Sequence, residues 1–239
     1  MDFEVIASSS GGCCYILCSG NLPPLILDAG VKFSDIQKAM GYATSDAAGV
    51  LVTHAHGDHS KAVKNFLAAA IEVYASKECW DELGISSYYG KPLVANESRV
   101  IEGWIVLPFT AVHDSPGTLG FMIGDGMGNR ALYLTDSAYS PHRFENLTHI
   151  YVECNYSREI MHKNTASGAI DQDRFRRTVE SHMSLETLLD LLKANDMSKV
   201  REIHLLHLSD ANSDEVAFAD AVRETTGKPV YIAAKRVTA

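Results

Sequence analysis

The sequence has no long apolar run and no export signal at its start. No stretch approaches the roughly 20 apolar residues that a membrane-spanning helix needs. Residues 1–6 (MDFEVI) lack the basic region and the long apolar region of a signal peptide, and they predict the start of a first strand. We therefore expect a cytoplasmic protein without membrane contact.

The sequence also lacks paired cysteines. Its cysteines are odd in number and none of them forms a CxxC pair. Cys13, Cys14 and Cys18 fall in an apolar strand pattern, so they are more typical of small core residues than of a zinc site. Without an export signal, we expect all five to be reduced. They are Cys13, Cys14, Cys18, Cys79 and Cys154.

Positive charge is in short supply. Lysine and arginine number 21 against 30 aspartates and glutamates, which gives a net charge of −9 at pH 7. A protein that grips a long nucleic acid usually presents a basic face that neutralises phosphates. The balance favours a small anionic substrate, or a nucleic acid bound at one short basic patch.

No repeat, low-complexity tract or linker interrupts the chain, so we expect one domain over residues 1–239. Short apolar runs and helical spacing interleave in both halves, which predicts an α/β protein with two sheets face to face and helices outside. Ser184 is the expected N-cap of one helix. The predicted strands are residues 2–7, 13–18, 24–28, 50–53, 103–108, 119–124, 130–134, 148–152, 202–206 and 229–232. The predicted helices are residues 32–40, a segment from 60, 185–194 and a segment from about 214.

One short segment concentrates metal-binding side chains. Residues 53–59 (THAHGDH) follow an apolar strand and precede a helix, so their side chains project from a loop at a strand end. Three imidazoles and a carboxylate this close cannot all bind one ion. They can serve two neighbouring ions, with His54 and His56 on one and Asp58 and His59 on the other. These donors suit zinc, and also manganese, iron or nickel.

This HxHxDH segment resembles the central motif of the metallo-β-lactamase superfamily, and the resemblance extends over essentially the whole chain. It implies the αββα four-layer sandwich of that family and a centre with two divalent ions, zinc first and manganese as the alternative. By the same resemblance, Asp28 in a DxG turn supports the metal loop, His113 is the third histidine of the first ion, Asp136 bridges both ions, and His207 completes the second. His204, three residues before His207, is expected to be structural.

Departures from other members narrow the chemistry. β-Lactamases of this fold place a cysteine where Asp136 stands, and flavo-diiron members place a glutamate where His56 stands. The sulfur-oxidising dioxygenases dispense with the second metal's ligands, whereas Asp58, His59 and His207 are all present here. Glyoxalase II and lactonase relatives keep every ligand, so other residues must separate them.

Two further residues resemble a catalytic pair of tRNase Z. Glu153 in IYVECN is similar to the glutamate of a His-Glu-Ala-Thr motif, and His182 in ESHMS is similar to the histidine of a GHST segment. A histidine held by a carboxylate is suited to protonate a leaving ribose oxygen. The resemblance therefore implies phosphodiester hydrolysis with His182, Glu153 and the metal ligand Asp58 as catalytic residues. The alternatives are a core-edge ion pair for Glu153 and a cap neighbour for His182.

The whole pattern is most similar to the YycJ/WalJ group and to the phage anti-Pycsar phosphodiesterases, whose opening the segment ASSSGGCCY resembles. The flexible arm with which tRNase Z binds tRNA is absent. Ser115 and Thr118 are candidates to line a nucleotide pocket, or only an ordinary turn. Arg174, Arg176 and Arg177 are candidates to meet phosphate, or only a solvated face.

We therefore expect a phosphodiesterase with two metal ions that hydrolyses a small phosphodiester, a cyclic mononucleotide in the first instance. The alternatives are a WalJ-like DNA exonuclease, then tRNA processing or a glyoxalase II-type acyl hydrolase. An inactive regulatory module is disfavoured because no ligand position is missing. A homodimer is expected only by analogy with relatives. If the chain is encoded by a phage, as the resemblance to the anti-Pycsar phosphodiesterases allows, we expect it in the host cytoplasm.

Overall fold

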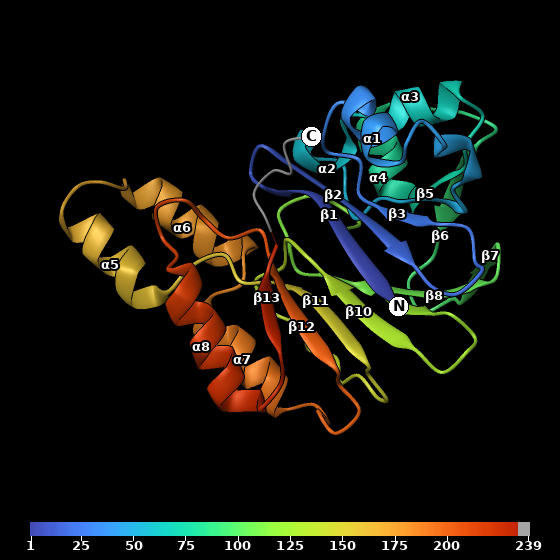
Figure 1. Cartoon of the computed structure of the whole chain (residues 1–239). Helices are drawn as coiled ribbons and strands as arrows, with labels where there is room; N and C mark the ends of the chain where they lie inside the picture. Colours follow the sequence, from blue (N-terminus) through green and yellow to red (C-terminus); the bar gives the residue numbers. More distant parts are fainter. Residues whose placement is uncertain (234–239) are drawn as a thin grey trace. The chain divides into compact units, whose positions relative to one another are not determined.

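The computed structural model describes residues 1–233, whose contacts separate into two units (Figure 1). The first unit contains residues 1–110 and 115–129, and the second contains residues 111–114 and 130–233. No helix among the described residues has the length and apolar character to cross a membrane. The predicted domain over residues 1–239 includes residues 234–239, which lie outside the described residues; no predicted strand or helix falls on them.

The first unit contains a mixed sheet whose strands lie side by side in chain order. β1 to β3 are antiparallel, and β3 to β6 are parallel, so the carboxyl ends of the parallel strands meet at one edge. The strands are β1 (Asp2–Ser9), β2 (Gly12–Cys18), β3 (Leu25–Leu27), β4 (Gly49–Leu51), β5 (Val73–Ser76) and β6 (Gly90–Leu93).

Helices cover one face of this sheet (Figure 1). Ile36 of the first helix and Phe66 of the third pack with sheet residues such as Val50 in one buried apolar cluster, which fixes the helices on the strands. The helices are α1 (Phe33–Ala39), α2 (Gly57–Ser60), α3 (Val63–Ala68) and α4 (Lys77–Leu83), with a 3₁₀ turn at Thr44–Asp46.

Three more strands of the first unit form an antiparallel meander. β8 pairs with β7 on one side and with β9 on the other. Trp104 at the start of β8 is fully buried, and its indole Nε1 donates a hydrogen bond to the Pro23 carbonyl at 2.8 Å. The strands are β7 (Arg99–Ile101), β8 (Trp104–Thr110) and β9 (Leu119–Gly124).

The second unit is built on parallel strands, with helices in the connections from β11 to β12 and from β12 to β13. β10 pairs with β11, β11 with β12, and β12 with β13, all in parallel. α7 and α8 lie side by side along these strands, while α5 and α6 form a hairpin set away from them (Figure 1). The strands are β10 (Arg130–Leu134), β11 (His149–Glu153), β12 (Glu202–Leu206) and β13 (Val230–Ile232). The helices are α5 (Arg158–Ala166), α6 (Gln172–Ser181), α7 (Leu185–Lys193) and α8 (Glu215–Thr226).

Candidate metal centre

The HxHxDH segment leaves the carboxyl end of β4 and runs into the short helix α2, as predicted. His54 and His59 are fully buried, and His56 and Asp58 are half-buried. The apolar strand therefore delivers two buried imidazoles to the sheet edge where its parallel neighbours also end, which is where sites are commonly built in α/β sheets.

Asp28 holds this segment in place. Its Oδ1 accepts hydrogen bonds from the Thr53 backbone N–H at 2.8 Å and from the Thr53 hydroxyl at 3.0 Å, and its Oδ2 lies 2.8 Å from His59 Nδ1. The carboxylate is fully buried, and its backbone is left-handed with φ of 57°. The predicted support of the metal loop by Asp28 is confirmed by these contacts. Because His59 donates from Nδ1, its Nε2 is left to bind a metal.

His54 and His56 are spaced as two ligands of one ion. The Thr53 hydroxyl donates its proton to Asp28, so the Thr53 oxygen accepts a hydrogen bond from His54 Nδ1 at 3.0 Å. His54 Nε2 is therefore the nitrogen that can bind a metal. That Nε2 lies 3.1 Å from His56 Nδ1. Two nitrogens that bind the same zinc ion, each at about 2.0–2.1 Å, lie roughly 3.0–3.4 Å from each other. The distance between His54 Nε2 and His56 Nδ1 therefore fits two ligands of one metal ion.

In the second unit, two candidate ligands follow directly on strand ends. Asp136 comes after β10 and His207 after β12, and both have left-handed backbones, with φ of 46° and 51°. Such conformations are costly for residues other than glycine and gather at functional sites. His207 Nδ1 lies 3.0 Å from Asp136 Oδ1, so the two parallel strands on either side of β11 present the two predicted ligands together.

Glu153, at the end of β11, connects the residues around it. Its Oε1 accepts from His182 Nδ1 at 2.7 Å and from His207 Nδ1 at 2.9 Å. Its Oε2 accepts from the backbone N–H groups of Ser137 at 3.1 Å and Met183 at 3.0 Å. Glu153 is fully buried, yet four donors surround its carboxylate, which is what a buried charge requires.

Electrostatics favour a charged pair of Glu153 and His182. Burial alone lowers the pKa of His182, but the charge and the hydrogen bond of Glu153 outweigh it, and the pKa is raised above the ordinary value. Burial alone raises the pKa of Glu153, while the positive charge of His182 overrides it and lowers the pKa. The arrangement keeps a proton on the half-buried imidazole of His182.

His113 is anchored by helix α6. Its Nδ1 lies 2.8 Å from the carbonyl oxygen of Ser181, the last residue of that helix. A carbonyl oxygen only accepts, so Nδ1 carries the proton and Nε2 is the ligand nitrogen. Burial lowers the pKa of His113, which favours the neutral ring that a metal binds.

The positions of the candidate substrate residues do not by themselves indicate a binding site. The Ser115 hydroxyl donates to Glu82 at 2.9 Å, and the Thr118 hydroxyl donates to the Ser115 carbonyl at 2.7 Å, as in an ordinary turn. Arg174, Arg176 and Arg177 are exposed along α6, which ends next to His182. Their contact with substrate stays a prediction.

His204 is placed as a structural residue. Its Nε2 lies 3.2 Å from Glu202, and its ring packs between those of Tyr151 and Tyr231. Sequence reasoning missed other residues of the centre. These are Thr53 and the backbone amides of Ser137 and Met183.

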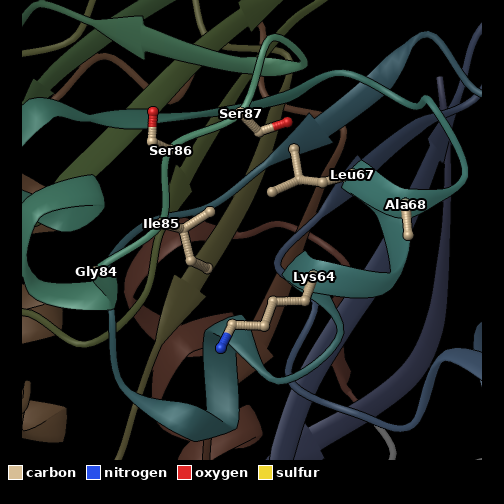
Figure 2. A pocket seen from close by; sticks show the side chains of 7 residues that line it. All are labelled: Lys64, Leu67, Ala68, Gly84, Ile85, Ser86 and Ser87. Carbon is tan, nitrogen blue, oxygen red and sulfur yellow. The ribbon is translucent and has the colours of Figure 1, made fainter.

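A surface hollow in the first unit contains none of the candidate ligands. Figure 2 shows Leu67 and Ile85 facing across it, with Ser87 near Leu67. The residues lining it are Lys64, Leu67, Ala68, Gly84, Ile85, Ser86 and Ser87.

The donor set within each unit therefore suits divalent metal ions. Residues 25–207 match the family model of the beta-lactamase superfamily domain, and the chain belongs to this family. The predicted fold class is confirmed as the α/β metallo-β-lactamase fold with two mixed sheets. No curated protein is similar enough in sequence to count as a match.

Solved structures share this fold at low sequence identity. The metallo-β-lactamase fold protein YhfI from Bacillus subtilis is 17% identical with a TM-score of 0.75, over 98% of this chain and 97% of its own. A diphosphatase from the PhnP family is 12% identical with a TM-score of 0.67, over 98% and 94%. The short form of human tRNase Z is 14% identical with a TM-score of 0.65, over 99% and 98%.

Proposed function

We propose that this chain is a metal-dependent phosphodiesterase that hydrolyses a small phosphodiester, with cyclic mononucleotides as the first-choice substrates. The observation that carries the proposal is the pair formed by Glu153 and His182 beside Asp136. His182 Nδ1 lies 2.7 Å from Glu153 Oε1 and 3.9 Å from Asp136 Oδ2. A protonated imidazole next to a candidate metal ligand is what cleavage of a phosphodiester with a poor leaving group requires.

The ligands are assigned from the family motif and the donor geometry within each unit. His54, His56 and His113 would hold the first ion; Asp58, His59 and His207 would hold the second; Asp136 would bridge them. When bound, two divalent ions polarise phosphoryl oxygens and lower the pKa of water. Zinc is the first choice and manganese the alternative. Asp58 would act in catalysis through the metal it binds.

His182 supplies the proton that the leaving oxygen needs. Its Nδ1–H is fixed on Glu153, so the second proton of the imidazolium is on Nε2. The His182 side chain is 20% exposed, whereas Glu153 is fully buried, so the imidazole is the partner that substrate can reach. Glu153 orients the ring and keeps it protonated; His182 donates Nε2–H to the departing ribose oxygen and later recovers a proton from solvent.

The proposal of a small substrate rests on charge and size. The net charge of −9 opposes binding along a polyanion. No basic Gly/Pro-rich arm interrupts the sequence, which disfavours tRNA processing. Two proteins with this fold are named as a diphosphatase and a tRNase, so the fold is compatible with phosphorus chemistry.

A DNA exonuclease of the WalJ type is the second candidate. The observation that favours it is the exposed cluster of Arg174, Arg176 and Arg177 on α6, the helix that leads to His182. An acyl hydrolase of the glyoxalase II type would explain the metal ligands but would give Glu153 and His182 no catalytic role.

The test replaces His182 by alanine and compares substrates that differ in leaving group. We expect His182→Ala to keep its metals and fold but to lose on the order of 10²–10⁴ in kcat/KM on a nucleotide phosphodiester. The loss should shrink on a p-nitrophenyl phosphodiester, whose leaving group hardly needs a proton. The control is His162→Ala, which removes an exposed histidine on α5.

Equal losses on good and poor leaving groups would contradict the role of His182 as a general acid. Thioester or lactone hydrolysis that survives His182→Ala, with no phosphodiester cleavage by the wild type, would instead support the acyl hydrolase.

A further inference from the structure

Tyr139 is a large exposed aromatic residue close to a candidate metal ligand, and the proposed chemistry does not use it. It lies three residues after Asp136 in the connection between β10 and β11, and it is 51% exposed. We propose that Tyr139 stacks on the base of a nucleotide substrate, and so selects phosphodiesters that carry a planar aromatic base. The inference rests on the proposed function, since it concerns the substrate of the same site.

Hydrogen bonds fix the two residues that precede Tyr139. The Ala138 backbone N–H donates to the Val112 carbonyl at 2.8 Å. The Ser137 hydroxyl oxygen accepts from the Val112 backbone N–H at 3.0 Å, and the hydroxyl donates to the Tyr139 carbonyl at 2.8 Å. Val112 directly precedes His113. The backbone that carries Tyr139 is therefore bonded to the segment that carries a second candidate metal ligand.

The same backbone segment is bonded to the candidate acid–base pair. The Ser137 backbone N–H donates to Glu153 Oε2 at 3.1 Å, and Glu153 Oε1 accepts from His182 Nδ1 at 2.7 Å. Ser137 is fully buried, so these hydrogen bonds are shielded from water. Three residues of fully extended chain span at most about 11 Å, which limits the distance from Asp136 to Tyr139. Tyr139 thus lies at a fixed position at the edge of the candidate centre.

The side chain of Tyr139 is available to a ligand. Among the described residues its hydroxyl makes no hydrogen bond and its ring packs on no other aromatic ring. A tyrosine has few rotatable bonds, so it offers a rigid apolar face at low entropic cost.

A single exposed ring suits a mononucleotide. Proteins that bind a nucleic-acid strand stack successive bases on several aromatic rings. In the connection from β10 to β11 the only other Phe, Tyr or Trp is Phe144, and it is buried. Every nucleobase has a π face, so stacking on Tyr139 requires a base but tolerates different bases. Because the contact lies away from the reacting phosphate, it should affect binding of substrate rather than the chemical step.

The experiment measures kcat and KM of the metal-loaded full chain for wild type, Tyr139→Ala and Tyr139→Phe. The substrates are a purine 3′,5′-cyclic mononucleotide, its pyrimidine counterpart, and ribose 3′,5′-cyclic phosphate without a base. We expect Tyr139→Ala to raise KM on the purine nucleotide roughly 5- to 100-fold with kcat little changed. The rise should be smaller on the pyrimidine nucleotide and absent without a base.

Tyr139→Phe keeps the ring and should behave like the wild type. Calorimetry adds a readout that does not depend on turnover: binding of the nucleoside monophosphate product should weaken in Tyr139→Ala and not in Tyr139→Phe. The matched control is Tyr42→Ala, which removes an exposed tyrosine of the first unit.

Thermal unfolding identifies any variant that is merely misfolded, and Tyr139→Phe is the milder change. An unchanged KM in Tyr139→Ala, an equal rise on the substrate without a base, or a Tyr139→Phe variant as impaired as Tyr139→Ala would each overturn the stacking role. The proposed function would then still stand. A wild-type chain that cleaves none of the three substrates would contradict the proposed function, and the stacking role with it.

Discussion

At the scale of single residues, Asp136 is the candidate ligand on which the proposed metal centre depends most. It follows β10 with a left-handed backbone, is nearly fully buried, and has an oxygen 3.0 Å from His207 Nδ1. A bridging carboxylate is shared by both ions, so its loss should disturb both. We expect close to two divalent ions per wild-type chain by elemental analysis and a deficit at both sites in Asp136→Ala. One tightly bound ion in an active protein, with Asp136 dispensable, would refute the two-ion arrangement.

His149 makes the stability of the fold depend on pH. Burial lowers its pKa from 6.5 to about 4, so the folded chain keeps the ring neutral while the unfolded chain protonates it. The contribution is therefore fully present above pH 6.5 and is lost as the pH falls toward 4. Between these limits the wild type should lose about 2 kcal/mol of unfolding free energy more than His149→Gln. Urea denaturation at several pH values measures this difference, and parallel curves for the two proteins would show that His149 does not contribute.

Most candidate ligands could be predicted from the sequence, because the motif places them directly after apolar strands. Their connections could not. Glu153 was expected to hold His182, yet it also binds His207 Nδ1 and two backbone amides that carry no sequence signal.

At the scale of elements, Gly30 explains why the turn after β3 and the metal loop fit together. A Cβ on Gly30 would lie 1.5 Å from the Asp58 carbonyl oxygen and 2.8 Å from the Cys13 nitrogen. Both obstacles are backbone atoms, so the loop itself would have to move. We expect Gly30→Ala to destabilise the metal-free protein by on the order of 1–3 kcal/mol and to reduce metal content. Thermal unfolding and elemental analysis measure the two effects.

The matched control is Gly57→Ala in the metal loop, where an added Cβ meets nothing within 4 Å. If Gly30→Ala unfolded at the same temperature as this control and kept its metals, the close approach of Gly30 to Asp58 would not matter.

Elements with strong apolar patterns were predicted well. The structure contains the first three predicted strands, the strands of the second unit and the helix predicted at 185–194, each within a few residues of its predicted bounds. Ser184 caps α7 by accepting a hydrogen bond from the Thr187 N–H. The predicted helix from residue 60 corresponds to α3, which begins at Val63, and the separate short helix α2 before it was not predicted. α6 was missed because it is almost wholly exposed, so its sequence lacks the apolar stripe that marks the buried face of a helix. β6 was missed because it contains Gly90 and Pro92, which disfavour a central strand.

At the scale of the whole molecule, the proposal of a small substrate rests on how charge is distributed. The chain is acidic overall, and its exposed arginines on α6 form a short cluster. A nuclease that neutralises several phosphates loses affinity steeply as salt rises, in proportion to the number of contacts. One cyclic nucleotide has a single phosphate, so its binding should depend weakly on salt.

The family and the α/β fold were accessible from the sequence because the motif and its order define them. The prediction of one domain over residues 1–239 stays a prediction. The substrate is not accessible in the same way, because relatives with this fold are 17% identical or less among those compared, and such likeness shows the fold alone.

The most direct test of the account is to compare the turnover of 3′,5′-cyclic mononucleotides with that of single- and double-stranded DNA by the metal-loaded chain at low and physiological salt. We expect cyclic-nucleotide cleavage to exceed DNA cleavage, with KM little changed by salt and only a modest loss when Arg174, Arg176 and Arg177 are replaced together by alanine. Efficient DNA degradation that collapses in this triple variant, with no cyclic-nucleotide activity in the wild type, would contradict the account and favour the exonuclease.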